Sequence, residues 1–137
     1  MTIHVLQALI RQHRPDLFFL SEKMVPSSHF QAFLFGLGFS SWFEVPPVGS
    51  QGEIFLTWKF GVDVKHGRLD KRCISCLVYL DPSVCPRLIS CIYAPAIALG
   101  HHDFWPFLSD MGNSFGGLWL LMGDFNYQNI SKSFFSL

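Results

Sequence analysis

The chain has 137 residues, of which half are hydrophobic, 16% are aromatic and only 15% are charged, whereas soluble domains average about 25% charged residues. This length suits one domain, 1–137, and a chain so rich in aromatic side chains and so poor in charge is not intrinsically disordered. Its ten basic and ten acidic residues cancel, so it lacks the basic excess that holds a phosphate backbone by charge alone.

The sequence also indicates where in the cell the protein is expected. No apolar run reaches the roughly 18 residues of a membrane-spanning helix, and the N-terminus lacks the basic and then apolar pattern of a signal peptide. An intracellular protein that does not enter a membrane is therefore expected, with nuclear and cytoplasmic locations both open. The four cysteines are then expected to be reduced thiols.

The spacing of apolar residues predicts helices alternating with buried strands. Helices are expected where apolar residues recur three and four positions apart, and strands where short apolar runs are bounded by turn residues. Pro15 is expected to end the first helix and a glycine the second, while Asp103 caps the last helix and Pro106 falls in its first turn. In chain order, the expected elements are a helix over 3–14, a strand over 16–20, a helix from 27 or 28 to 36 or 38, and strands over 39–45 and 53–60. A polar loop or edge strand over 61–72, a hairpin of strands over 73–80 and 87–93, a helix over 103–111 and a last clear strand over 118–122 follow.

The segment "GLWLLMGDFNYQ" ends an apolar strand on a carboxylate and an amide. Gly123 permits a sharp turn or a close approach of the backbone. If the chain stays extended, Asp124 and Asn126 point the same way and Phe125 points the other way. The two polar side chains would then form a small site of the kind found beyond strand ends. Local chemistry taken alone favours a plain turn, because Asp and Asn bond readily to their own backbone.

A second apolar strand, in "RPDLFFLSE", also ends on a carboxylate, Glu22. Two such acids suit Mg²⁺, which takes one or two carboxylates together with waters and substrate phosphate oxygens. Five segments then occur in order: "LIRQHRPDLFFLSE", "GSQGEIFLTWK", "ISCIYAP", "FW" with a Leu three residues later, and "WLLMGDFN". This ordered set resembles the endonuclease/exonuclease/phosphatase superfamily, the fold of DNase I, and more narrowly the endonuclease domain of plant LINE-type (non-LTR) retroelements.

The resemblance implies an α/β (mixed α+β) fold, namely a partial four-layer DNase I-like sandwich of mixed sheets with flanking helices. It implies Glu22 as a ligand of Mg²⁺, with Mn²⁺ as an alternative and with weak binding. It implies that Tyr93 contacts the scissile phosphate, that Asp124 aligns or activates the attacking water, and that Asn126 positions the phosphate. DNA is the implied partner.

The sequence also departs from the family pattern. The family begins with a strand that ends in a metal-site Asn, and it ends with a catalytic His preceded by an Asp; neither feature is present here. The expectation is therefore an incomplete domain, a catalytically impaired remnant of a Mg²⁺-dependent DNA endonuclease. An open sheet edge would allow self-association or binding of a protein partner. A non-catalytic interaction module and a fragment of a phosphatase of the same superfamily remain as alternatives.

Two further groups allow two interpretations each. Cys73 and Cys76 have zinc-like spacing, but in a strand they point to opposite faces, which favours packing thiols. His101 and His102 could belong to a metal cluster, although a loop before the capping Asp103 is favoured.

The tryptophans and the basic residues also allow two interpretations each. The four tryptophans are expected in the core rather than as platforms for bases, because each lies in an apolar run. The basic cluster is expected to be a solvated loop, with a strip beside nucleic acid as the alternative. The two groups are Trp42, Trp58, Trp105 and Trp119, and Lys65, Arg68, Lys71 and Arg72.

Overall fold

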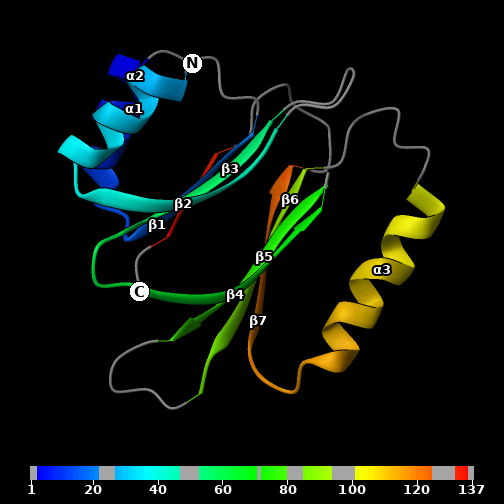
Figure 1. The fold of residues 1–137 in the computed structure, drawn as a ribbon. Coiled ribbons are helices and arrows are strands. Elements are labelled where there is room, and N and C mark those ends of the chain that lie inside the picture. The colour runs from blue at the N-terminus through cyan, green and yellow to red at the C-terminus, as the bar shows by residue number, and fades with distance from the viewer. Residues whose placement is uncertain are drawn as a thin grey trace.

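A computed structural model describes residues 3–21, 27–46, 53–70, 72–79, 85–93, 101–124 and 132–135. Figure 1 shows the arrangement of the helices and strands. Their bounds are α1 Ile3–His13, β1 Leu17–Ser21, α2 Ser27–Gly36, β2 Phe39–Val45, β3 Ile54–Lys59, β4 Asp63–Asp70, β5 Cys73–Tyr79, β6 Arg87–Tyr93, α3 His101–Ser114, β7 Trp119–Asp124 and β8 Lys132–Phe135.

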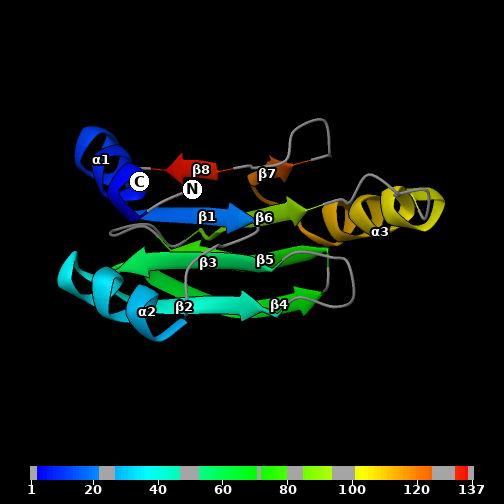
Figure 2. The same ribbon diagram turned by 90° about the horizontal axis from the view of Figure 1, so that it is seen from above.

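The strands form two four-stranded sheets that face each other, with helices on the outer faces (Figures 1 and 2). The first sheet has the order β2-β3-β1-β8, and all of its described pairs are antiparallel. The second has the order β4-β5-β6-β7, in which β6 and β7 are parallel and the other pairs antiparallel. The expected mixed α/β fold is therefore confirmed, while its assignment as part of a DNase I-like sandwich stays a prediction.

Strand β1 explains why the run "LFFL" has no polar position. All five of its residues are buried, and successive side chains point to opposite faces of the sheet. Leu17 and Phe19 belong to the core between the two sheets. Phe18 and Leu20 belong to the core beneath α1 and α2. A strand covered on both faces must be apolar throughout.

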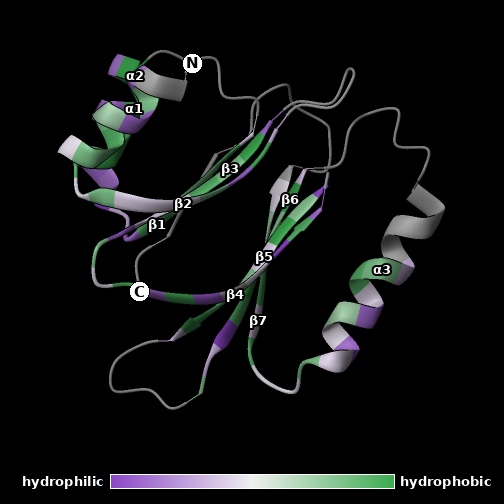
Figure 3. Ribbon diagram, in the orientation of Figure 1, coloured by the Kyte–Doolittle hydropathy of each residue, from purple (hydrophilic) through white to green (hydrophobic). Residues whose placement is uncertain are grey.

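Helix α3 covers the outer face of the second sheet. Leu108 and Met111 of this helix form one core cluster with Cys73, Leu88 and Ile92 of the sheet. Figure 3 shows that hydrophobic residues dominate β3, β5 and β6, whereas hydrophilic residues recur along β4. This polar strand lies at the edge of the second sheet, which is one of the two placements expected for 61–72. Among the described residues, no helix combines the length and the apolarity that crossing a bilayer requires.

The first two helices end where the sequence predicts. After α1, Arg14 adopts a φ of 46°, and its N–H donates to the carbonyl of Ile10 at 2.8 Å. Pro15 then follows, and proline cannot continue the helical hydrogen bonds. After α2, Gly38 adopts a φ of 92°, a conformation that glycine reaches without steric cost.

Two predictions about the elements are wrong. Helix α3 begins at His101, so Asp103 lies inside it rather than at its cap, and Pro106 is not in its first turn. The proline removes one backbone bond near the start of the helix, while Leu108 and Met111 anchor the remainder in the core. A further strand, β8, follows β7 and pairs with β1; it is not predicted, because "KSFF" is too short for a strand period to be seen.

The cysteines of "CISC" face opposite sides of the second sheet, as expected. Cys73 belongs to the core under α3, and Cys76 belongs to the core between the sheets with Cys91. Burial raises the pKa of Cys73 to about 11 and that of Cys76 to about 12, and it raises the pKa of Cys91 well above 9.0. Only Cys85 among the four is exposed.

Thiol-specific reagents should therefore distinguish Cys85 from the other cysteines. The thiolate is the reactive form, and burial both hides the other three thiols and disfavours their ionisation. We expect one cysteine to be alkylated by iodoacetamide in the native protein and all four after denaturation, as counted by mass spectrometry. Fast native modification of Cys73, Cys76 or Cys91 would contradict the packing described here.

The same thiols predict a loss of stability in alkali. Their folded pKa values lie above the ordinary value of 9.0, so the folded state holds more protons than the unfolded state above that pH. The free energy of unfolding should have its full thiol contribution below about pH 9 and decline as the pH rises towards 11 and 12. Urea unfolding across this range measures the slope, which should be shallower in Cys76→Ala. An equal slope in this variant would count against the assignment.

Candidate functional site

The carboxyl ends of β1, β6 and β7 lie at the same end of the sandwich. Figure 1 shows these ends at the top, and the arrows of the three strands point the same way in Figure 2. We call this end the rim and define it by the last residues of the three strands, Ser21, Tyr93 and Asp124. Strand β1 belongs to the first sheet and the other two to the second. Both sheets therefore contribute to the rim.

Tyr93 and Asp124 are brought together by the parallel pairing of β6 with β7, in which they form the last register pair. Tyr93 is 6% exposed and packs in the core between the sheets. Its backbone N–H donates to the carbonyl of Arg72 at 2.8 Å, which fixes the end of β6 against the start of β5. For Asp124 the structure describes the backbone and not the side chain.

The other two predicted site residues, Glu22 and Asn126, lie outside the described residues. The structure does describe the end of β1 at Ser21, which is 2% exposed and immediately precedes Glu22 in the sequence. Within the described ranges, no group of three or more His, Cys, Asp or Glu side chains could hold a metal ion. Because Glu22 and Asn126 lie outside the described ranges, the predicted Mg²⁺ site stays a prediction.

Gly123 allows β7 to approach β6 closely, which is one of the two roles that the sequence suggests for it. Its φ is 142°, a value that residues with a side chain rarely adopt. A Cβ atom at this position would overlap the backbone oxygen of Ile92 and lie 2.7 Å from the nitrogen of the same residue. The glycine therefore sets the course of the backbone directly before Asp124.

Among the described basic residues, Lys65 and Arg68 lie on β4, and Arg72 lies in the turn between β4 and β5. Arg68 and Arg72 both stand over the ring of Phe107 on α3, with centroid distances of 5.9 and 5.7 Å. Arg72 also pairs with Asp70 at 3.5 Å. For Lys65 and Arg68, the place on an edge strand corrects the expectation of a loop, whereas Arg72 lies in a turn as expected. A strip along nucleic acid stays a prediction, and Lys71 lies outside the described residues.

A buried polar cluster that the sequence patterns do not predict lies between the second sheet and α3. The hydroxyls of Ser75 and Ser90 lie 2.9 Å apart, and Trp119 Nε1 donates to Ser90 Oγ at 3.0 Å. Both hydroxyls also lie 3.2 Å from Met111 Sδ. A signal was available, because these serines interrupt the two apolar strands of a predicted hairpin and pair across it.

The described tryptophans all contribute to packing. Trp58 belongs to the core between the sheets, Trp42 packs against the core under α1 and α2, and Trp119 packs against the core under α3. The side chain of Trp105 is not among those described, and neither are the side chains of His101 and His102. For the three described tryptophans, the predicted core role is confirmed.

The sequence predicts an open sheet edge, and the outer edge of β7 is a candidate for it. This strand is the last of the second sheet among the described residues. Leu118 directly before it is 63% exposed, and Leu121 within it is 39% exposed. A protein partner at this edge stays a prediction.

Comparison with known proteins adds no assignment. No family model matches the chain, and no curated protein matches it either. The family resemblance therefore rests on the sequence segments given above.

The close approach at Gly123 predicts a large cost for adding a methyl group there. We expect Gly123→Ala to lower the free energy of unfolding by about 3 kcal/mol, because it adds both backbone strain and overlap with Ile92. Urea unfolding followed by tryptophan fluorescence measures this cost. Gly116→Ala is the matched control, since no atom lies within 4 Å of its added Cβ, and it should change stability by less than about 0.5 kcal/mol. Equal effects at the two positions would refute the close approach.

Proposed function

We propose that the rim is a site for Mg²⁺-dependent hydrolysis of phosphodiesters, with DNA as the substrate, in a DNase I-like domain. The observation that carries the proposal is the common direction of β1, β6 and β7, which end together at the rim (Figures 1 and 2). Glu22 follows the first of these strands, and Tyr93 and Asp124 end the other two. In layered α/β proteins, ligands bind beyond the carboxyl ends of strands.

The layer order gives further support. Two facing sheets with α1 and α2 on one outer face and α3 on the other have the helix-sheet-sheet-helix order that the resemblance implies. The residue types also suit the reaction. In the proposed arrangement, Asp124 would accept a proton from the attacking water, and the Asn126 amide and the Tyr93 hydroxyl would donate to phosphate oxygens.

The donor set fits a hard cation. Carboxylates and amide carbonyls are oxygen ligands of the kind that Mg²⁺ takes alongside waters, and Glu22, Asp124 and Asn126 supply them. In the proposal, Glu22 would hold the ion, and the carboxylate of Asp124 would be the second one close enough to contact that ion. When bound, the cation would neutralise charge that develops on the phosphate during hydrolysis.

The positions of the histidines bear on the expected rate of DNA cleavage. The resemblance implies a histidine that faces the scissile phosphate, but no histidine follows β1, β6 or β7 directly in the sequence. A general acid or base must lie within hydrogen-bond reach of its proton and contributes a factor of about 100 to 10,000. We therefore expect slow cleavage by these 137 residues. The six histidines are His4 and His13 on α1, His29 on α2, His66 on β4, and His101 and His102 at the start of α3.

A plasmid assay tests the proposed reaction. The chain should convert supercoiled DNA to the nicked form slowly, and only with Mg²⁺ or Mn²⁺, because the proposed site needs a cation against the phosphate. Glu22→Gln and Asp124→Asn should reduce nicking to the background. Asp110→Asn is the control, since this exposed residue lies on α3. Hydrolysis of a phosphomonoester such as p-nitrophenyl phosphate, without nicking, would favour the phosphatase alternative.

Metal binding can be tested independently of turnover by titrating Mn²⁺ and observing amide signals. Paramagnetic broadening should affect the amides of the rim residues Ser21, Tyr93 and Gly123, because the proposed ion lies near them. The amides at the other ends of the same strands, Leu17, Arg87 and Trp119, should broaden much less, because they lie farther from the proposed ion. Broadening that is uniform along the strands, or unchanged in Glu22→Gln, would disprove the proposed metal site.

A further inference from the structure

A hollow lies on the outer face of the second sheet, between α3 and the edge strand β4. It has a volume of about 200 Å³, below the roughly 300–1,000 Å³ of sites for drug-sized ligands. It is separate from the rim, and nothing said of it rests on the proposed hydrolysis. We call it the outer hollow, and its lining residues are Arg68, Ser75, Leu77, Leu88, Met111, Ser114 and Phe115.

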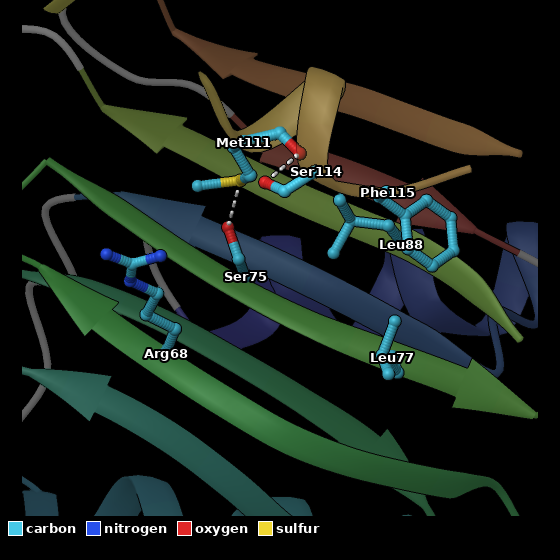
Figure 4. Close-up of a pocket in the computed structure, with 7 residues that line it drawn as sticks. All are labelled: Arg68, Ser75, Leu77, Leu88, Met111, Ser114 and Phe115. Carbon is cyan, nitrogen blue, oxygen red and sulfur yellow. Dashed lines mark hydrogen bonds between the residues drawn. The ribbon is translucent and has the colours of Figure 1, made fainter. Parts of the chain in front are cut away.

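The outer hollow is charged at one end and apolar at the other. Figure 4 shows the guanidinium of Arg68 at one end, and Leu77, Leu88 and Phe115 grouped at the opposite end. Ser75 and Met111 lie between the two ends (Figure 4). A ligand that fills this space must therefore carry an apolar body and a single polar group.

Arg68 is available to bind an anion. It is exposed, and among the described residues no carboxylate forms an ion pair with it, whereas Lys65 pairs with Asp63 and Arg72 with Asp70. Its contact with Phe107, at 5.9 Å from the ring centroid, is with an aromatic ring and uses no carboxylate. The N–H groups at the guanidinium edge can still donate to a planar carboxylate.

The apolar wall restricts the charge of the ligand. Leu88 is 8% exposed and Met111 is 9% exposed, so a group placed against them loses water. A doubly charged phosphate would lose more hydration energy there than a singly charged carboxylate. Among the described residues of the lining, the only charged side chain is that of Arg68, which matches one negative charge.

We propose that the outer hollow binds a small amphipathic carboxylate, with the carboxylate on Arg68 and an alkyl or aryl body against Leu77, Leu88 and Phe115. The class includes medium-chain fatty acids and arylalkanoic acids. Octanoate serves as the probe, and octan-1-ol, of equal chain length without the charge, is its neutral counterpart.

Methionine methyl groups provide a readout inside the protein. With ¹³C-methyl methionine in the full chain, octanoate should cause a saturable shift of the Met111 methyl signal at concentrations below about 10 mM. Met122 packs against the core between the sheets, on the other face of the second sheet, so its signal should not move. Octanol should bind at least tenfold more weakly.

Two matched substitutions on β4 test the role of Arg68. Arg68→Gln should weaken octanoate binding about tenfold, the effect of losing one charge-assisted hydrogen bond. Lys65→Gln removes an equal charge from the same strand outside the outer hollow, and it should leave the affinity unchanged. Because both side chains are exposed, neither substitution should disturb folding, and Ser114→Phe should abolish binding by filling the space.

Several outcomes would overturn the proposal. These are the absence of a saturable Met111 shift, equal binding of octanol and octanoate, and equal losses in Arg68→Gln and Lys65→Gln. The first would mean that the space holds no such ligand, the second that charge plays no part, and the third that only the net charge of the protein matters.

Discussion

The packing of one sheet against the other is the constraint on which the rest of the structure depends. Leu17 and Phe19 of the first sheet share one core with Cys91 and Tyr93 of the second. Because each sheet buries its inner face in this way, its outer face still needs cover, and the helices provide it. The same packing brings strands of both sheets to a common end, where side chains far apart in the sequence can meet.

Much of this architecture can be predicted from single segments. "LFFL" has no polar position because β1 is covered on both faces, and the paired apolar runs around "DPSVCP" predict the hairpin of β5 and β6. Gly123 was recognised because a glycine between an apolar strand and a carboxylate suggests a backbone constraint. These features depend on the spacing of residues that are close together in the chain, and a single sequence is enough to show that spacing.

Other features depend on neighbours that the sequence does not identify. β8 is a strand because it pairs with β1, and four residues give no period of their own. Helix α3 extends beyond its predicted ends, although Pro106 lies inside it. The position of Arg68 over Phe107 depends on how β4 and α3 meet, so the outer hollow could not be foreseen. For the rim, the sequence predicts four site residues, of which the structure describes Tyr93 and the backbone of Asp124.

The parallel pairing of β6 with β7 has a consequence for folding kinetics. Antiparallel neighbours can be joined by a tight turn, but parallel ones need a long crossover, which here runs from residue 94 to residue 118 and contains α3. Closing such a loop costs chain entropy before any contact is gained, and pairings distant in sequence slow the approach to the native state. The hairpins β2–β3 and β5–β6 can form early, whereas Tyr93 and Asp124 become neighbours only after the crossover closes. The two halves of the rim in the second sheet are thus assembled late, whatever chemistry they serve.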